Sequence, residues 1–531
     1  MRLIIVNDRS FFEPGGDGEP GGDGEACGHG EACGHGEACG HGEACGHGEA
    51  CGHSGARDAA RGVVDPGGLA TALTGDEFPD KLFMSSARGP AQRALAARGA
   101  VDFDAGARRF RVRLVASPEA AYRAFYDVAA NDLLWLLHHG RWHRDITPAQ
   151  IDAYRTGYRV VNQAMARALA EEAAAAAAAE AAEAAEAAAP AEGQVHVLWQ
   201  DYQFYLAPAL ARRALPPGVM KNVIFQHFLH VPFPGPEHWA RLPARIGAEL
   251  LRGLLGNDMI GFQLPAYGQN FLRCCQRFLG LPIHEDAVHL PDGRVVRVAS
   301  HPIPAAPGHL TATARQAGTR ELAAALRRRA GDRTLIYRTE RVDPVKAFPA
   351  AMRAYEMLLC RPGVKGNVVY VAQLVPARQG IARFAAERER DARIARELNE
   401  RHGTEGWQPV ELVFARDFPG AVAGYLEYDV LDIVPWADGM NLVALEGPLV
   451  NARDGALVLS TTAGAHELLR PHAIGVPPGD PARHAAALHA ALAMPRAERA
   501  RRAAALRAVA AAGDPAGWLT RQVAAARSTS R

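Results

Sequence analysis

The run from Pro435 to Glu446 combines an acid, a glycine and an amide at the end of a predicted strand. It reads Pro-Trp-Ala-Asp-Gly-Met-Asn-Leu-Val-Ala-Leu-Glu and follows an apolar segment at 430–434. An apolar helix is expected next, and the free N–H groups at a helix N-terminus favour a diphosphate. Asp438 and Asn441 can hydrogen-bond sugar hydroxyls, and Glu446 can hold a ribose diol. The run therefore predicts a sugar-nucleotide site, the alternative being an ordinary helix capped by Asp438.

A second run places two cations after a buried strand. The apolar segment 334–337 leads into residues 338–346, which read Arg-Thr-Glu-Arg-Val-Asp-Pro-Val-Lys. Arg341 and Lys346 then share one loop at the C-terminal end of the strand. Negative charge grows on a diphosphate when its glycosyl bond breaks, and preorganised cations lower that barrier. The alternative is a solvated loop with incidental charges.

A third pair of polar clusters follows two further strands. The strand within 222–230 ends at His230 and a Pro-Phe-Pro turn, and the strand 195–198 is followed by Trp199-Gln200-Asp201-Tyr202. Ligands of open parallel sheets gather at such strand ends. Taken alone, His230 is more typical of a core histidine than of a catalytic one.

These runs together resemble the retaining glycosyltransferases that include trehalose-6-phosphate synthase. The family's H-x-P-F-P, E-R-x-D-x-x-K and D-G-M-N-L-V-x-x-E runs are matched by residues 230–234, 340–346 and 438–446. The likeness extends from residues 7–9 and 67–69 to Ala463-Gly464-Ala465. It implies an α/β protein of the GT-B fold, in which two Rossmann-like doubly wound domains face a cleft.

The resemblance also implies roles for single residues. Those that match the family's donor site are Gly68, Arg341, Lys346, Asp438, Gly439, Met440, Asn441, Leu442, Val443 and Glu446. Those that match its acceptor site are Arg9, Tyr126, Trp135, Asp201 and Arg378. The expected catalytic residues are Asp201, His230, Arg341, Lys346 and Asp438. The resemblance implies no metal, because the two cations and the helix end take its role, and no cofactor is expected. The family reaction runs on one face of the sugar, with the donor phosphate helping to deprotonate the acceptor, so no protein nucleophile is expected.

The expected reaction moves glucose from a nucleoside-diphosphate glucose to glucose 6-phosphate, giving trehalose 6-phosphate. Ala437 and Leu445 stand where the family usually has Arg and Lys, and Gln200 and Gln203 replace two histidines. Residues 70–73 replace a tryptophan-rich acceptor segment. Alternatives are therefore a glucosylglycerol-phosphate synthase, a validoxylamine-phosphate-synthase-like pseudo-glycosyltransferase, or a non-catalytic sugar-phosphate-binding homologue. The retained Arg341, Lys346, Asp438 and Glu446 argue against a non-catalytic homologue. The sequence does not distinguish uridine, guanosine and adenosine as the base of the donor.

Composition agrees with an enzyme of two domains. The chain has 531 residues, 48% of them hydrophobic, and a net charge of +1. A chain of that length is expected to form two domains, each with its own hydrophobic core. The balanced charge argues against a surface that binds nucleic acid. No apolar run approaches the roughly 20 residues of a membrane helix. A cytoplasmic location is expected, since the start is too short for a secretory signal and Cys274, Cys275 and Cys360 suit packing better than disulfides. Homo-oligomerisation is left open.

The elements that must position these residues form two α/β sets. The first set of expected strands is 2–6, 195–199, 222–230 and 258–262, and the second is 334–338, 367–373, 410–414, 430–434 and 456–460. A proline-rich run at 301–307 separates them. The expected domains are therefore 1–305 for the acceptor and 306–512 for the nucleotide sugar. A final helix in 513–531, around Trp518 to Ala525, should return to the first domain.

Two segments of biased composition complete the chain. From Gly24 to His53 the unit Gly-Glu-Ala-Cys-Gly-His recurs, inside a low-complexity insert at 15–55. Cysteine and histidine are zinc and copper ligands, but perfect copies of a glycine-rich, apolar-poor unit are more typical of a repeat expansion that builds no core. The alanine-rich segment 168–191 is expected to extend a preceding helix into solvent.

Overall fold

The computed structural model describes residues 2–8, 10–14, 60–64, 68–105, 108–141, 145–186 and 194–528. Arg9 and the Gly-Glu-Ala-Cys-Gly-His repeat lie outside the described residues. Their assignments therefore stay predictions.

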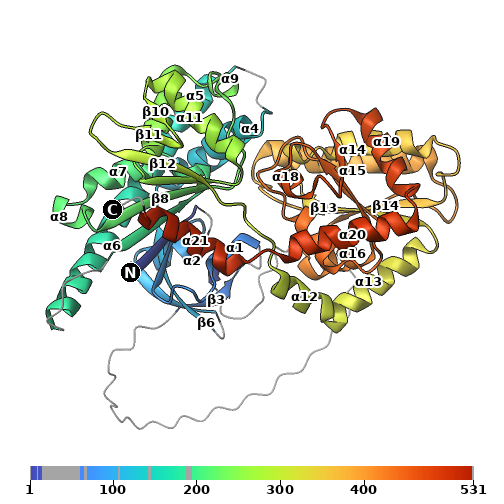
Figure 1. Ribbon diagram of the computed structural model, residues 1–531, viewed down its shortest axis with the longest axis horizontal. Helices are drawn as coiled ribbons and strands as arrows, with labels where there is room; N and C mark the ends of the chain where they lie inside the picture. Colours follow the sequence, from blue (N-terminus) through green and yellow to red (C-terminus); the bar gives the residue numbers. More distant parts are fainter. Residues whose placement is uncertain are drawn as a thin grey trace, which may run out of the picture.

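Two sheets organise the described part of the chain (Figure 1). The first has the order β10-β11-β12-β9-β8-β7-β1-β4-β6-β5-β3-β2. Its strands are β1 Arg2–Val6, β2 Phe12–Pro14, β3 Ala60–Val64, β4 Lys81–Ser86, β5 Ala100–Ala105, β6 Arg108–Val115, β7 Val195–Gln200, β8 Val223–Leu229, β9 Met259–Phe262, β10 Ile283–His284, β11 Ala287–His289 and β12 Val295–Ser300. The stretch from β12 to β6 is parallel throughout, and antiparallel pairs occur only toward the edges of this described sheet.

The second sheet is parallel and doubly wound. Its order is β15-β14-β13-β16-β17-β18, with β13 Thr334–Arg341, β14 Val368–Val375, β15 Val410–Phe414, β16 Val430–Ile433, β17 Ala456–Ser460 and β18 Ile474–Val476. In chain order this is 3-2-1-4-5-6, so the direction of winding reverses between β13 and β16. Ligands of such sheets bind in the crevice at the carboxyl ends of the strands at this switch point.

Helices cover both faces of each sheet. Around the first sheet lie α1 Gly68–Leu73, α2 Pro90–Ala96, α3 Glu119–Arg123, π-helix η1 Ala124–Leu134, α4 Trp135–His138, α5 Pro148–Ala153, π-helix η2 Tyr154–Tyr158, α6 Arg159–Glu186, 3₁₀ turn η3 Tyr202–Phe204, α7 Ala207–Ala214, α8 Pro217–Met220, α9 Pro236–Trp239, α10 Ala244–Leu254 and α11 Pro265–Leu279. Around the second lie α12 Pro307–Arg315, α13 Ala317–Ala330, 3₁₀ turn η4 Pro344–Lys346, α14 Phe348–Leu359, α15 Ala382–His402, α16 Phe418–Glu427, α17 Val443–Val450, α18 Ala465–Leu469, α19 Pro481–Leu492 and α20 Arg496–Ala511. Strand β13 shows why both faces are covered: Leu335 and Tyr337 pack into one core cluster and Ile336 into another.

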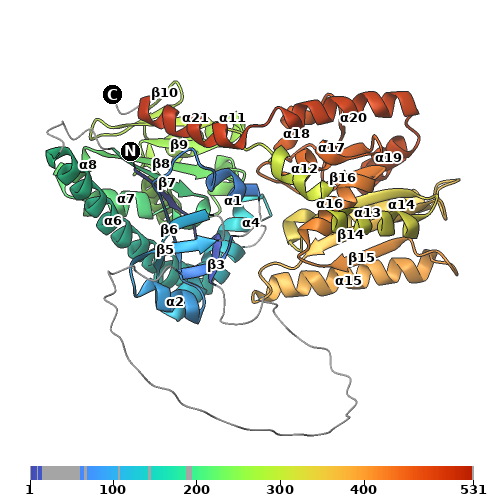
Figure 2. The ribbon, with the colours of Figure 1, turned by 90° about the horizontal axis from the view of Figure 1, so that it is seen from below.

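The last helix, α21 Pro515–Ser528, leaves the second sheet and lies over the first (Figure 2). It packs against β8 and α1. Trp518 is buried there, and its indole N–H donates to the His301 carbonyl at 2.8 Å. This helix therefore ties the end of the chain to the N-terminal sheet.

The alanine-rich segment is packed more closely than its composition suggested. It belongs to α6, and Ala173 and Ala176 are buried. The expectation of a solvated extension was wrong for this part, because alanine is small enough to let the helix approach its neighbours. None of the described helices is both long and apolar enough to cross a membrane.

An acid on α15 is buried without a full set of partners. Asp391 is only 1% exposed, and its Oδ1 has no hydrogen-bond partner in the described structure. Burial, together with Glu387 and Glu340, raises the pKa of Asp391 to about 8. The folded chain therefore keeps a proton that the unfolded chain releases above the ordinary pKa of 3.8, and stability should fall as pH rises from 3.8 to about 8.

We expect Asp391→Asn to reduce this loss of stability, because the amide carries no proton to release. The midpoint of thermal unfolding, followed by circular dichroism from about pH 6 to about pH 9, should fall less in the variant than in the wild type. The exposed Asp152→Asn serves as the control and should follow the wild type. Parallel curves for the wild type and Asp391→Asn would contradict the prediction.

Candidate active site

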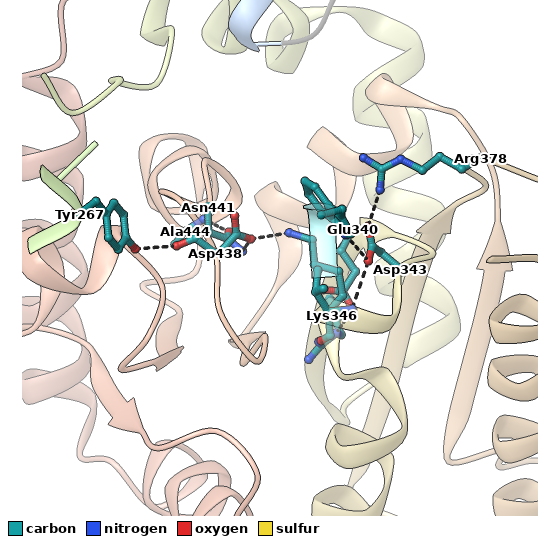
Figure 3. Close-up of polar contacts among 11 residues, drawn as sticks. Tyr267, Glu340, Asp343, Lys346, Arg378, Asp438, Asn441 and Ala444 are labelled. Atoms are coloured by element: carbon teal, nitrogen blue, oxygen red, sulfur yellow. Dashed lines mark hydrogen bonds and ion pairs between the residues drawn. The ribbon is translucent and has the colours of Figure 1, made fainter. Parts of the chain in front are cut away.

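The switch point of the second sheet brings the predicted donor residues together. Strands β13 and β16 pair in parallel, so the loops that follow them are neighbours. The Lys346 ammonium forms an ion pair with the Asp438 carboxylate, and Asn441 Nδ2 donates to Asp438 Oδ2 at 3.0 Å (Figure 3). Burial opposes ionisation of Asp438, but Lys346 holds its pKa below the ordinary value. The site therefore keeps a fixed negative and a fixed positive charge side by side.

The loop after β16 leads into α17 in a strained conformation. Asn441 has a φ of 68°, and its Oδ1 accepts from the Ala444 N–H at 3.3 Å. In the described structure, the N–H groups of Leu442 and Val443 have no hydrogen-bond acceptor. Because α17 begins at Val443, these two donors lie at the positive end of the helix dipole. The arrangement suits an anion.

Two of the predicted donor residues lie at the edges of this loop pair. Glu446 Oε2 accepts from the Tyr425 hydroxyl at 3.2 Å, and burial raises the pKa of the Glu446 carboxyl. Arg341 ends β13 with an exposed side chain, 5.5 Å from the centre of the Trp135 ring. Gly68 opens α1, and its role in a donor site stays a prediction.

The predicted acceptor residues from the two sheets meet at one carboxylate. Asp343 Oδ1 accepts from the Trp135 indole N–H at 3.1 Å. Asp343 Oδ2 accepts from Arg378 Nη1 at 2.9 Å (Figure 3). The Arg378 guanidinium lies 4.3 Å from the centre of the Trp135 ring and 5.1 Å from that of Phe384. Trp135 belongs to α4 and Arg378 follows β14, so this contact joins the two domains.

Tyr126 is placed by an unusual helix. It lies in η1, where Asn131 Nδ2 donates to the Tyr126 carbonyl at 2.8 Å. Asn131 Oδ1 in turn accepts from the Tyr202 hydroxyl at 2.8 Å. Tyr202 is the neighbour of Asp201 in the chain, so Asn131 fixes Tyr126 relative to the Asp201 turn. π-Helices are often found at functional sites.

Asp201 occupies a strained turn at the end of β7. It has a φ of 62°, and its Oδ1 accepts from the backbone N–H groups of His230 at 3.1 Å and Val231 at 3.3 Å. Burial raises the pKa of Asp201 to about 6, although these hydrogen bonds oppose the shift. Strand ends β7 and β8 are thus locked together at the site.

The His230 ring is held on both sides by glutamines. Its Nε2 donates to Gln200 Oε1 at 2.7 Å, and its Nδ1 accepts from Gln263 Nε2 at 3.3 Å. Burial lowers the pKa of His230 to about 3, so the ring is neutral. Both ring nitrogens are therefore used within the protein, and a contact from the ring to a sugar stays a prediction.

Gly439 lies directly against the backbone of the first domain at His230. A Cβ atom there would lie 1.6 Å from the His230 carbonyl oxygen, so any other residue would force the two apart. Close by, the Tyr267 hydroxyl donates to the Asp438 carbonyl at 3.2 Å (Figure 3). The glycine is needed here for space, since its φ is not among the positive values.

The sequence interpretation missed two residues of this site. Asp343 stood in a quoted motif but received no role. His139 is 4% exposed, its ring lies 4.1 Å from that of Trp135, and its Nδ1 donates to the Trp135 carbonyl at 2.7 Å. Burial lowers the pKa of His139 to about 4, although the nearby Asp438 and Asp343 raise it. No single-sequence signal marks His139, because only the fold brings it to these acids. Within the described ranges, no group of three or more His, Cys, Asp or Glu residues could hold a metal ion.

The comparison with protein families decides the class. The model of glycosyltransferase family 20 matches residues 81–528. The chain belongs to glycosyltransferase family 20. It is 31% identical over 372 residues to the alpha,alpha-trehalose-phosphate synthase [UDP-forming] 2 of Aspergillus niger, which covers 69% of this chain and 72% of that protein. The family assignment confirms a glycosyltransferase of the trehalose-phosphate synthase type.

Two solved structures of similar fold confirm the expected architecture. One, from E. coli bound with UDP-2-fluoro glucose, has a TM-score of 0.74 and 23% identity, covering 100% of this chain and 99% of that chain. The other, an alpha,alpha-trehalose-phosphate synthase (UDP-forming) from Burkholderia xenovorans in complex with glucose-6-phosphate, has a TM-score of 0.73 and 22% identity, covering 99% and 100%. The chain has the GT-B fold of this family, with two Rossmann-like domains facing a cleft.

We expect Gly439→Ala to impair turnover while leaving each domain folded. The added methyl group collides with the His230 carbonyl, so the domains cannot meet as they do here, and a misplacement of about 1 Å can cost on the order of 100-fold in rate. The measurement is kcat together with the midpoint of thermal unfolding. Gly308→Ala is the matched control, because no heavy atom lies within 4 Å of its added Cβ. A kcat near that of the control would contradict the prediction.

Proposed function

We propose that this family 20 enzyme transfers glucose from UDP-glucose to glucose 6-phosphate with retention of configuration, forming trehalose 6-phosphate. The observation that carries the proposal is the Lys346–Asp438 ion pair beside the free N–H groups of α17. The A. niger relative is UDP-forming, and the two solved structures hold a UDP-glucose analogue and glucose-6-phosphate. These relatives support both substrate classes.

On the donor side, the second domain supplies the charge. Lys346, Arg341 and the N–H groups that open α17 would face the diphosphate, where negative charge develops as the glycosyl bond breaks. Asp438 and the backbone at Gly439 and Met440 would bind glucose hydroxyls. Glu446 would hold the ribose through the oxygen that Tyr425 leaves free. These charged groups are already in position before the reaction, so the protein need not reorganise them as the transition state forms.

On the acceptor side, residues from both domains would bind the phosphate and orient the attacking hydroxyl. Tyr126, Trp135, Arg378 and, by resemblance, Arg9 would bind the phosphate. Asp201 would orient the hydroxyl by accepting a hydrogen bond from it. Burial raises the pKa of Asp201 to about 6, which still leaves the acid mainly ionised at neutral pH. A donor phosphate oxygen would take the proton as the new bond forms on the same face. Positioning and electrostatics then supply most of the rate.

The test of the substrates is nucleoside-diphosphate release from UDP-, GDP- and ADP-glucose, with and without glucose 6-phosphate, followed by mass analysis. We expect release from UDP-glucose that depends on glucose 6-phosphate and yields a disaccharide phosphate. Glycerol phosphate and an aminocyclitol phosphate serve as competing acceptors, because Gln200 and Gln203 depart from the family pattern. Turnover only with one of these, or none with a folded protein, would contradict the proposed acceptor.

We expect Lys346→Ala to lower kcat by about 100-fold or more, because it removes a preorganised cation from the leaving group. Thermal unfolding checks that the variant is folded. Lys365→Ala removes an exposed lysine from the same domain and should retain normal kcat. Near-normal turnover by Lys346→Ala would remove the diphosphate-clamp assignment.

A further inference from the structure

We propose that Asp343 is a positioning residue that couples binding in the acceptor pocket to the donor clamp. Its carboxylate holds one acceptor residue from each domain and also fixes the turn that carries Lys346. The inference rests on the proposed function for the identity of the ligands. Its structural part can be tested without them.

The Asp343 carboxylate accepts hydrogen bonds from donors in three segments. It is 3% exposed. Oδ1 accepts from the Trp135 indole at 3.1 Å and from the Val345 N–H at 3.1 Å, and Oδ2 accepts from Arg378 at 2.9 Å. A buried carboxylate with two neutral donors on one oxygen and a charged donor on the other has one preferred geometry. Displacing any one donor therefore disturbs the other two.

On the acceptor side, Asp343 sets the orientation of Trp135. The indole N–H is the only hydrogen-bond donor on that side chain, and it is directed across the domain boundary to Asp343. Arg378 stacks on the same ring at 4.3 Å while also contacting Asp343. A phosphate that binds Trp135 and Arg378 must therefore share them with, or move them from, this carboxylate.

On the donor side, Asp343 caps the short turn η4 that ends at Lys346. The turn is followed by Ala347 with a φ of 61°, and the Lys346 carbonyl accepts from the fully buried Arg338. The Val345 carbonyl accepts from the Trp436 N–H at 2.9 Å, which joins the turn to the Asp438 loop. The Lys346 backbone is thus held from both sides. Because Lys346 is only three residues from Asp343 in the chain, a shift of Asp343 would also move Lys346.

The two possible roles of the carboxylate can be separated by substitution. Asp343→Asn keeps an oxygen for Trp135 and Val345 but turns an N–H₂ group toward Arg378, so it breaks only the Arg378 contact. Asp343→Ala breaks all three. We expect Asp343→Asn to raise the KM for glucose 6-phosphate by about tenfold, and Asp343→Ala to lower kcat as well.

The coupling itself is measured as the ratio of UDP dissociation constants without and with glucose 6-phosphate. We expect a ratio of at least about 5 in the wild type and close to 1 in Asp343→Ala. The control is Asp132→Asn, which removes another contact between the domains, the 2.8 Å ion pair with Arg383, and should keep the wild-type ratio. An unchanged ratio in Asp343→Ala, or a ratio of 1 in the wild type, would overturn the inference.

Hydrogen exchange in the ligand-free protein separates this inference from the proposed substrates. Asp343→Ala should speed exchange both in residues 345–347 and in residues 126–139, because the carboxylate links the two segments. Asp132→Asn should leave residues 345–347 unchanged. Unchanged exchange of residues 345–347 in Asp343→Ala would refute the link, whatever the true substrates are. Inactivity of a wild type whose link is intact would instead count against the proposed function alone.

Discussion

The ion pair between Lys346 and Asp438 is the interaction around which the site is built. It exists because β13 and β16 are neighbours where the winding of the second sheet reverses, so that two loops far apart in sequence meet. Each partner is a poor residue to bury alone, and each is acceptable because the other is fixed opposite. Behind the pair, Arg338 binds the Lys346 carbonyl and the Glu340 carboxylate. A buried ionic group therefore supports the ion pair at the surface of the cleft.

Holding these loops costs backbone strain. Six non-glycine residues have positive φ in the described structure, and four of them lie at the site: Asp201, Ala347, Arg378 and Asn441. Each such residue costs about 1–3 kcal/mol and persists only where its surroundings determine it. Here the surroundings are specific. Asp201 is held by the N–H groups of His230 and Val231, and Asn441 is held by its contact to Asp438. Most of this strain is thus concentrated in the loops at the site.

The sequence predicted the fold class, because its contiguous motifs follow strong apolar strands, and the loops that carry the motifs after β13 and β16 do meet in the structure. It failed where tertiary structure decides. Strand β6 reads Arg-Arg-Phe-Arg-Val-Arg-Leu-Val, and so many cations hide its place near the edge of the sheet. The π-helix η1 has no recognised sequence signal, yet it places Tyr126. Asp343 and His139 matter through contacts to residues that are distant in the chain. The partners of the His230 ring, Gln200 and Gln263, are likewise brought to it only by the fold.

The histidines around the cleft contribute shape rather than charge. Burial lowers the pKa of His138 and His230 to about 3, and that of His139 and His227 to about 4. A neutral glutamine at position 200 is therefore a compatible partner for His230, since its Oε1 accepts a hydrogen bond from the uncharged ring at Nε2. The charges at the cleft belong instead to arginine, lysine and aspartate, which keep them at neutral pH. Gln200 thus sets the hydrogen-bonding pattern around the His230 ring without adding a charge, and the Lys346–Asp438 ion pair stays the charged contact at the switch point.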